Sequence, residues 1–370
     1  MDARARRRPP ERGRLDLAPL SVLVVNAGST SLKLHLVDRE EASTRLSGLD
    51  AAESAGLEAV AHRVVHGGEA FLEPAVIDDE VLQAIAGLEP LAPLHNAPAL
   101  AGIDDAMRRL PDVPHVAVFD TLFHASMPAE AREYAVPRRW REEWGVRRYG
   151  FHGLSVAWSA ERAAALLGRP ADDVGLVVCH LGGGCSVTAV AGGRSRDTTM
   201  GFSPLEGVPM ATRSGSVDPA VPAYLVREHG MDAAEVERAL TAESGLLGLG
   251  GSTDMRDLET AAAAGDEGAR LAIDVFCHRV AGAVGSMAVS AGRLDAVVFT
   301  GGIGEGSAIV RRRIARRLGV LGVEVDEARN DAVRDDADVA TAGSRAAILV
   351  VASREEVIAA RAARACLASH

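Results

Sequence analysis

Hydrophobic and polar positions along the chain follow two periods, one typical of strands and one typical of helices. The continuous apolar run Val22–Val25 predicts a buried strand, and the alternating segment Leu32–Val37 predicts a returning strand with one face in a core. The same strand–turn–strand order recurs about 150 residues later, with strands predicted at Leu176–Cys179 and Ser186–Val190 around a turn at Gly182–Gly184. Two such hairpins indicate a duplicated domain in which each half presents a tight turn to a shared cleft.

The rest of the chain alternates between helical and strand patterns. A last helix is predicted to begin near Ser353, a suitable N-cap residue with Glu356 at the third helical position. This alternation predicts an α/β protein with mixed sheets. The other helices are predicted at Asp79–Leu88, Ala99–Leu110, Ser155–Leu167, Ala234–Leu240, Leu258–Ser290 and Ser307–Leu318, and the other strands at His115–Phe119, Ala296–Thr300 and Ala346–Val351.

Length and charge narrow the class of protein. The 370 residues suffice for two domains of ordinary size. The net charge of −11 argues against nucleic acid or an anionic membrane surface as the main partner. No apolar run approaches the roughly 18 residues that a membrane span needs. We therefore expect no nucleic-acid partner and no membrane partner.

Two further features indicate the cellular compartment. The segment 1–20 is basic and has no apolar core, so we predict a disordered tail and not a secretory signal. The cysteines are scattered without the spacing of a disulfide framework or a metal site, which is typical of a reducing cytoplasm. They are Cys179, Cys185, Cys277 and Cys366.

Lys33 is the only lysine in the chain, and every other basic side chain except histidine is an arginine. Arginine is a planar fork and lysine a compact point charge, so the two are not interchangeable where one oxygen must be met at close range. Against this arginine-rich background, Lys33 indicates a chemical requirement in the first hairpin.

Three turns built from small residues follow predicted strands: "NAGSTS", "HLGGGCS" and "GGIGEGS". Small residues allow backbone N–H groups to approach phosphate oxygens closely. None of the three is a Walker A loop, because no Gly-Lys-Ser/Thr closes it. "GGIGEG" is also a poor dinucleotide fingerprint, because the third glycine of that motif would fall at Ser307.

Several charged side chains and a histidine lie in loops or at strand ends. Arg63 lies between apolar residues, Arg213 precedes a glycine turn, Asp120 follows the apolar run "HVAVF", and His152 follows Phe151. Taken singly, each is typical of an ordinary structural or surface role. His62 and His66 are four residues apart, but they lie in a β-rich run without the glutamate of a zinc protease, so no metal site is expected there.

Together these segments resemble the acetate kinase family, the acetate and propionate kinases of the actin-like and hexokinase-like superfamily. The resemblance extends from about Val22 to Ala363. It is carried by "NAGSTSLK", "HRVVHGGE", "LAPLHN", "FDTLFHASMP", "GVRRYGFHG", "DTTMGFSPLEG", "TRSGSVDP", "SGLLG", "FTGGIGE" and "REEVIAARA".

The resemblance implies a fold of two duplicated ribonuclease-H-like, or actin-like, domains with mixed sheets around a nucleotide cleft. It places a shortened N-terminal domain at residues 21–121 plus 354–370. It places the C-terminal nucleotide-binding domain at residues 122–353.

The resemblance also implies a reaction, the reversible phosphoryl transfer from ATP to acetate that gives acetyl phosphate and ADP. A carboxylate substrate is already ionised at neutral pH, so its reaction needs positive groups that offset the repulsion between two anions and does not need a general base. Asp120, His152 and Arg213 match the family's catalytic residues, and we expect Asp120 to orient an arginine or the water shell of a metal. The substrate-binding positions that match are Arg63, Val65, Leu94, Phe151 and Pro204.

The resemblance further implies Mg²⁺, or Mn²⁺, held at the positions of Asn26 and Glu355. It also implies a homodimer, and the cysteine pattern predicts a cytoplasmic one. The ATP-binding positions that match are Lys33, His180, Leu181, Gly182, Gly183, Gly184, Asp254, Met255, Arg256, Gly302, Ile303, Gly304, Glu305 and Gly306.

The chain departs from the family pattern around the phosphates. The stretch between Lys33 and Arg63 is several dozen residues shorter than the family's. These departures leave two alternatives open: a kinase of propionate, butyrate or another small carboxylate, and a nucleotide-binding regulator without turnover. The substituted positions are Leu154, Val156, Gly183, Ser216 and Gly306.

Overall fold

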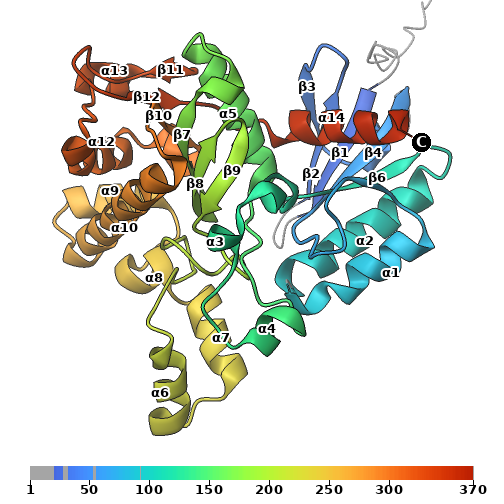
Figure 1. Cartoon of the computed structure of the whole chain (residues 1–370), viewed down its shortest axis with the longest axis horizontal. Helices are drawn as coiled ribbons and strands as arrows, with labels where there is room; N and C mark the ends of the chain where they lie inside the picture. The colour runs from blue at the N-terminus through green and yellow to red at the C-terminus, as the bar shows by residue number, and fades with distance from the viewer. Residues whose placement is uncertain (1–20, 28–31, 53–55, 92, 370) are drawn as a thin grey trace, which may run out of the picture.

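The computed structural model describes residues 21–27, 32–52, 56–91 and 93–369 of the chain (Figure 1). The predicted disordered tail, residues 1–20, lies outside the described part. Residues 28–31, which belong to the first predicted turn, also lie outside it.

The first sheet has six strands in the order β3-β2-β1-β4-β6-β5, with β1, β4 and β6 parallel and the other pairs antiparallel. Side chains alternate along β1, so Val22 and Val24 face the C-terminal helix while Leu23 and Val25 face the opposite layer. The strands are β1 (Ser21–Ala27), β2 (Leu32–Val37), β3 (Ser43–Leu46), β4 (Leu57–Val64), β5 (Ala75–Val76) and β6 (His115–Phe119).

Helices cover both faces of this sheet. The C-terminal helix α14 (Glu355–Ala368) packs on one face, and α2 (Pro93–Arg109) covers the other together with α1 (Asp79–Gly87) (Figure 1). Two short 3₁₀ helices, η1 (Leu49–Ala51) and η2 (Glu89–Leu91), complete this part of the molecule.

The second sheet repeats the first. Its order β9-β8-β7-β10-β12-β11 has the same pattern of parallel and antiparallel pairs, so the duplication predicted from the two hairpins is confirmed. The strands are β7 (Gly175–Leu181), β8 (Cys185–Ala191), β9 (Arg194–Thr198), β10 (Ala296–Thr300), β11 (Ala337–Asp338) and β12 (Ala347–Val350).

Helix α5 (Gly153–Leu166) packs on one face of the second sheet, and α9 (Met255–Ala263), α10 (Glu267–Ala291) and α12 (Ala308–Arg317) pack on the other. Because α5 also packs against α14, the two sheets are joined through this helix pair (Figure 1). The remaining elements are η3 (Leu122–Ser126), α3 (Ala129–Arg132), α4 (Arg138–Glu142), η4 (Ala171–Asp173), α6 (Ala220–His229), α7 (Ala233–Ala242), α8 (Gly245–Gly250), α11 (Gly301–Gly306), η5 (Leu318–Leu321) and α13 (Glu327–Ala332).

Several predicted elements are corrected by the structure. The single helix predicted at Leu258–Ser290 is two helices, α9 and α10, because the chain turns at Gly265 with φ of 98°. The predicted turn "GGIGEGS" is largely a helix, α11, and α2 begins at Pro93 instead of Ala99. The N-cap of α14 is Arg354 and not Ser353, whose N–H donates to the carboxylate of Glu305 instead.

Helix α10 is long and apolar enough to cross a bilayer by length and composition alone. Ten of its residues are buried, and they pack against the second sheet and its neighbouring helices in the largest hydrophobic cluster of the described chain. Its apolar character is therefore that of a core helix.

Candidate active site

A cavity of about 620 Å³ lies between the carboxyl ends of the central strands of the two sheets. This is the edge at which ligands bind in α/β proteins. Its lining comes from both halves of the duplication: Val24, Asn26, Lys33, His35, Arg45, Arg63, His152, Leu154, His180, Gly182, Gly183, Gly184, Gly301, Gly302, Glu305, Ser353, Glu355, Glu356 and Ala359.

Strand register brings three predicted residues into one row at the cavity floor. Lys33 pairs with Asn26 across β1 and β2, and Arg63 follows the residue of β4 that pairs with Val25. Because partners across a sheet point to the same side, the three side chains lie together. Arg63 Nη1 donates to Asn26 Oδ1 at 3.0 Å.

Arg63 is held by a buried carboxylate. Its Nε and Nη2 donate to the two oxygens of Asp120 at 2.8 and 2.5 Å, and its Nε lies 3.8 Å from Glu355 Oε2. Burial alone would lower the pKa of Arg63, but Asp120 and Glu355 together raise it above its ordinary value. Burial raises the pKa of Asp120, and the Arg63 guanidinium opposes that shift. Both oxygens of Asp120 therefore serve to orient Arg63 in this structure.

His152 reaches the cavity from a strained position at the start of α5. Its φ of 61° lies in the left-handed region, which is uncommon for a residue other than glycine. The next residue, Gly153, donates its N–H to the carbonyl oxygen of Asp120 at 2.9 Å, and a Cβ there would lie 2.2 Å from that oxygen. Glycine at position 153 thus allows α5 to begin directly beside Asp120.

His152 and His180 are packed ring against ring, with centroids 4.1 Å apart. His152 Nδ1 lies 3.0 Å from Ser186 Oγ, and His180 Nδ1 lies 2.7 Å from Ser155 Oγ. Burial is the largest cause that lowers the pKa of His152 well below its usual value, ahead of the neighbouring His180, Arg63 and Arg213, and burial also lowers the pKa of His180. Both rings are therefore neutral at pH 7.

The glycine turn after β7 closes the opposite wall. Gly182 N–H donates to the carbonyl of Gly184 at 3.0 Å. A Cβ on Gly184 would lie 3.1 Å from His152 Nε2 and 3.6 Å from Arg213 Nη1, so this turn meets both residues. Arg213 Nη1 also donates to the carbonyl of Pro204 at 3.2 Å, and burial lowers the pKa of Arg213.

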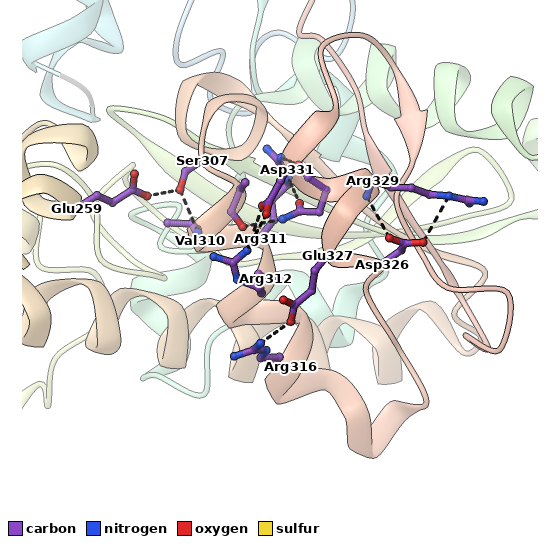
Figure 2. A network of polar contacts seen from close by, with 12 residues as sticks. Glu259, Ser307, Val310, Arg311, Arg312, Arg316, Asp326, Glu327, Arg329 and Asp331 are labelled. Atoms are coloured by element: carbon purple, nitrogen blue, oxygen red, sulfur yellow. Dashed lines mark hydrogen bonds and ion pairs between the residues drawn. The ribbon is translucent and has the colours of Figure 1, made fainter. Parts of the chain in front are cut away.

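The third small-residue segment, α11, is held in place by hydrogen bonds with Glu305 and with Arg311. Glu305 Oε1 accepts the N–H of Gly301 at 2.8 Å and that of Ser353 at 3.0 Å. Beneath α11, the buried Arg311 donates to the carbonyls of Gly304 and Glu305 at 2.9 and 2.7 Å. Figure 2 shows Arg311 within a wider network of polar contacts between α12 and α13.

Not every predicted site residue lines the cavity. Asp254 caps α9 and binds the Arg256 guanidinium on the surface, and the Met255 side chain is buried in the core. Ile303 likewise packs against the core, and Gly304 lies against the backbone of Phe299.

The expected apolar substrate pocket is described in part. Val65 and Phe151 belong to one buried cluster, and Pro204 is half-buried. Leu94 lies in α2, but its side chain is outside the described part of the structure.

Sequence reasoning missed several cavity residues. His35 follows Lys33 by two positions and therefore shares its face of β2, a signal that the alternation already contained. Arg45 pairs with His35 across β2 and β3 and also lines the cavity. Ser353 lines the cavity as well, although the sequence suggested only a helix-capping role for it.

The positions that depart from the family pattern have separate environments. Gly183 and Leu154 line the cavity, while Val156 is buried where α5 meets the second sheet. Ser216 lies outside the cavity and accepts the N–H of Gly207 at 3.1 Å. Gly306, the last residue of α11, does not line the cavity either.

Comparison with protein-family models and comparison with individual relatives point to the same family. A model of the acetokinase family matches residues 46–361. An acetate kinase from Deinococcus radiodurans is 47% identical over 382 residues, covering 92% of this chain and 96% of the relative. One from Carboxydothermus hydrogenoformans is 39% identical over 391 residues, covering 92% and 98%.

Solved structures are similar over the same extent. A propionate kinase from Francisella tularensis superposes with a TM-score of 0.87 at 36% identity, covering 93% of this chain and 99% of that structure. An acetate kinase from Porphyromonas gingivalis superposes with a TM-score of 0.83 at 32% identity, covering 94% and 99%.

Proposed function

This chain belongs to the acetokinase family, and we propose that it transfers the terminal phosphoryl group of ATP directly to acetate, reversibly, to give acetyl phosphate and ADP. The observation that carries the proposal is the Arg63 guanidinium, fixed by Asp120 and Asn26 on the floor of the cavity. A rigid cation at that point can bring a carboxylate and a triphosphate together despite their like charge.

Each catalytic residue then has a charge-related role. Arg63 binds the carboxylate, Arg213 stabilises the phosphoryl oxygens from the other side of the glycine turn, and His152 donates to them as a neutral ring. Asp120 positions Arg63 and moves no proton, because acetate with a pKa of about 4–5 is already ionised at neutral pH. Lys33 contacts the phosphates of ATP.

The chemistry of the cavity residues fits a magnesium ion. Asn26 Oδ1 and the Glu355 carboxylate are hard oxygen donors that line the cavity, and both lie close to the Arg63 guanidinium, at 3.0 and 3.8 Å. Mg²⁺ usually takes one or two protein oxygens and completes its shell with water and substrate phosphates. When bound, the ion would neutralise phosphate charge, and Asn26 and Glu355 would hold it; Mn²⁺ has similar requirements.

The apolar pocket supports a second substrate. Val65, Phe151 and Pro204 are expected to surround the methyl group of acetate, and one additional methylene changes the binding free energy by only about 1–3 kcal/mol. The similarity to a propionate kinase structure favours propionate as the alternative, ahead of butyrate.

A hydroxamate assay tests the function. Purified protein with ATP, Mg²⁺, hydroxylamine and acetate is expected to form acetohydroxamate, with a smaller signal from propionate. Absence of product with acetate, propionate and butyrate would exclude carboxylate kinase activity. A phosphorylated side chain trapped during turnover would exclude direct transfer.

A nucleotide-binding regulator without turnover is the candidate from another class. It is suggested by Gly183 and Gly306, where the resemblance leads us to expect asparagine amides near the phosphates. Calorimetry that finds tight ATP binding in a protein inactive with every short acid would favour it.

We also propose a cytoplasmic homodimer with the domain division 21–121 plus 354–370 and 122–353. Exposed apolar side chains on and near α6 make the second domain the better dimer surface. They are Val217, Val221, Tyr224 and Val226.

A further inference from the structure

Ser186 occupies the position in the second hairpin that corresponds to Lys33 in the first. It pairs with His180 across β7 and β8, one residue pair before the turn, as Lys33 pairs with Asn26 in the first hairpin. The duplication therefore puts Ser186 where the first half of the molecule has its only lysine. The serine is fully buried, and its hydroxyl lies behind the ring of His152.

The direction of the contact between Ser186 and His152 follows from burial. Either atom could donate across the 3.0 Å between Ser186 Oγ and His152 Nδ1. Within the described residues, however, the hydroxyl of Ser186 has no acceptor other than this nitrogen. A buried O–H that finds no acceptor is unfavourable, so Ser186 donates and Nδ1 accepts.

The other ring nitrogen faces the glycine turn after β7. His152 lines the cavity, and its Nε2 lies beside Gly184, where the Arg213 guanidinium also approaches. A neutral imidazole carries one N–H, so accepting at Nδ1 leaves the hydrogen on Nε2. The alternative tautomer would direct a lone pair at the phosphoryl oxygens and repel them.

We propose that Ser186 is a positioning residue that holds His152 as the neutral Nε2–H tautomer, so that the ring presents an N–H to the transferring phosphoryl group. This inference rests on the proposed kinase function and adds a residue to it. A neutral donor suits this cavity because Arg63 and Arg213 already supply positive charge near the ring.

Nitrogen NMR of histidine-labelled protein tests the tautomer without any assay of activity. In the wild type at pH 7, His152 Nδ1 is expected to give the signal of an unprotonated nitrogen and Nε2 that of a protonated one. In Ser186→Ala the two signals should move toward an exchange average, whereas Ser186→Thr, which keeps the hydroxyl, should retain the wild-type pattern.

Kinetics test the consequence. Ser186→Ala should lower kcat about tenfold while the KM values for ATP and acetate change less than about twofold. The reason is that a His152 ring without a fixed tautomer stabilises the transition state less well but leaves substrate binding almost unchanged. Ser186→Thr should restore most of kcat. Ser159→Ala is the matched control: Ser159 is also a fully buried serine, but its hydroxyl has no hydrogen-bond partner among the described residues and it lies outside the cavity, so kcat should not change.

Wild-type spectra with a protonated Nδ1 on His152 would overturn the proposal, as would unchanged kcat in Ser186→Ala. If Ser186→Ala fails to fold, the wild-type and Ser186→Thr spectra still decide. If the protein has no kinase activity, the NMR pattern tests the tautomer alone, so failure of the function and failure of this inference are distinguishable.

Discussion

At the scale of single residues, the proposed activity depends on the chemical identity of a few side chains, and Lys33 is the clearest case. Lys33 stands in a row with Asn26 and Arg63, and in the described part of the chain no hydrogen bond or ion pair occupies its ammonium group. A compact charge in that place suits a phosphate oxygen.

Lys33→Arg should therefore reduce kcat/KM for ATP by at least about tenfold, because a planar fork cannot occupy the position of a point charge. The thermal midpoint should stay within a few degrees, since the side chain is exposed. Arg39→Lys, at an exposed ion pair with Glu58, is the control and should leave kinetics unchanged. Wild-type rates in Lys33→Arg would show that the identity of the cation is unimportant.

Asp120→Asn distinguishes orientation from proton transfer. Losing the carboxylate leaves the half-buried Arg63 without its bidentate partner, so we expect kcat to fall by about 10² or more and the KM for acetate to rise. Asp295→Asn, which weakens an ion-pair cluster away from the cavity, should leave kcat unchanged.

The pH profile supplies the second half of this test. If Asp120 only orients Arg63, the wild-type kcat should be constant from about pH 6.5 to 8, because acetate is ionised throughout that range. A kcat that follows one ionising group in this range, with the dependence lost in Asp120→Asn, would instead identify Asp120 as a base.

At the scale of elements, α11 connects the proposed nucleotide side of the cavity to the start of α14. One carboxylate oxygen of Glu305 holds both Gly301 and Ser353, and Ser353 lies two residues before Glu355. The buried Arg311 supports the same helix by donating to the carbonyls of Gly304 and Glu305. The position of α11 is thus coupled to that of a proposed metal-binding residue.

Glu305→Ala should raise the KM for ATP about tenfold, the cost of losing charge-assisted hydrogen bonds to two backbone groups. It should also speed hydrogen exchange at the amides of Gly301 and Ser353. Glu305→Gln keeps an oxygen acceptor and should lie near the wild type, and Glu327→Ala on the surface of α13 is the control. Unchanged exchange at Ser353 in Glu305→Ala would contradict the coupling.

At the scale of the whole molecule, buried neutral histidines link stability to pH. Burial is the largest cause that lowers the pKa of His62 to about 3, of His66 to about 4 and of His124 to about 4. An unfolded chain would protonate these rings near the ordinary pKa of about 6.5. Acid therefore favours the unfolded state between that value and the folded pKa values.

The free energy of unfolding should fall as pH drops below about 6.5, and these three rings alone contribute a slope of roughly 4 kcal/mol per pH unit when each takes up one proton on unfolding. Urea titrations at pH 7, 6 and 5 measure this slope. His229→Gln, which removes an exposed histidine, should not change it. A flat stability profile between pH 6.5 and 5 would contradict the burial of these rings.

Much of the fold could be predicted because it depends on local periodicity. The apolar runs that became β1, β6 and β10 and the alternation in β2 were visible as patterns, and the repeated hairpin indicated the duplication. Errors occurred where small residues decided the outcome. Gly265 divided one predicted helix into two, and the glycine-rich segment after β10 formed α11 instead of a turn.

The sequence by itself determined the chemistry available to this protein: its strand and helix patterns, one lysine among arginines, and motifs typical of the acetokinase family. Only the tertiary structure decided which groups meet. Arg63 and Asp120 are 57 residues apart and His152 and Ser186 are 34 apart. Their contacts depend on strand register and on where α5 begins, and periodicity within one segment carries no information about either.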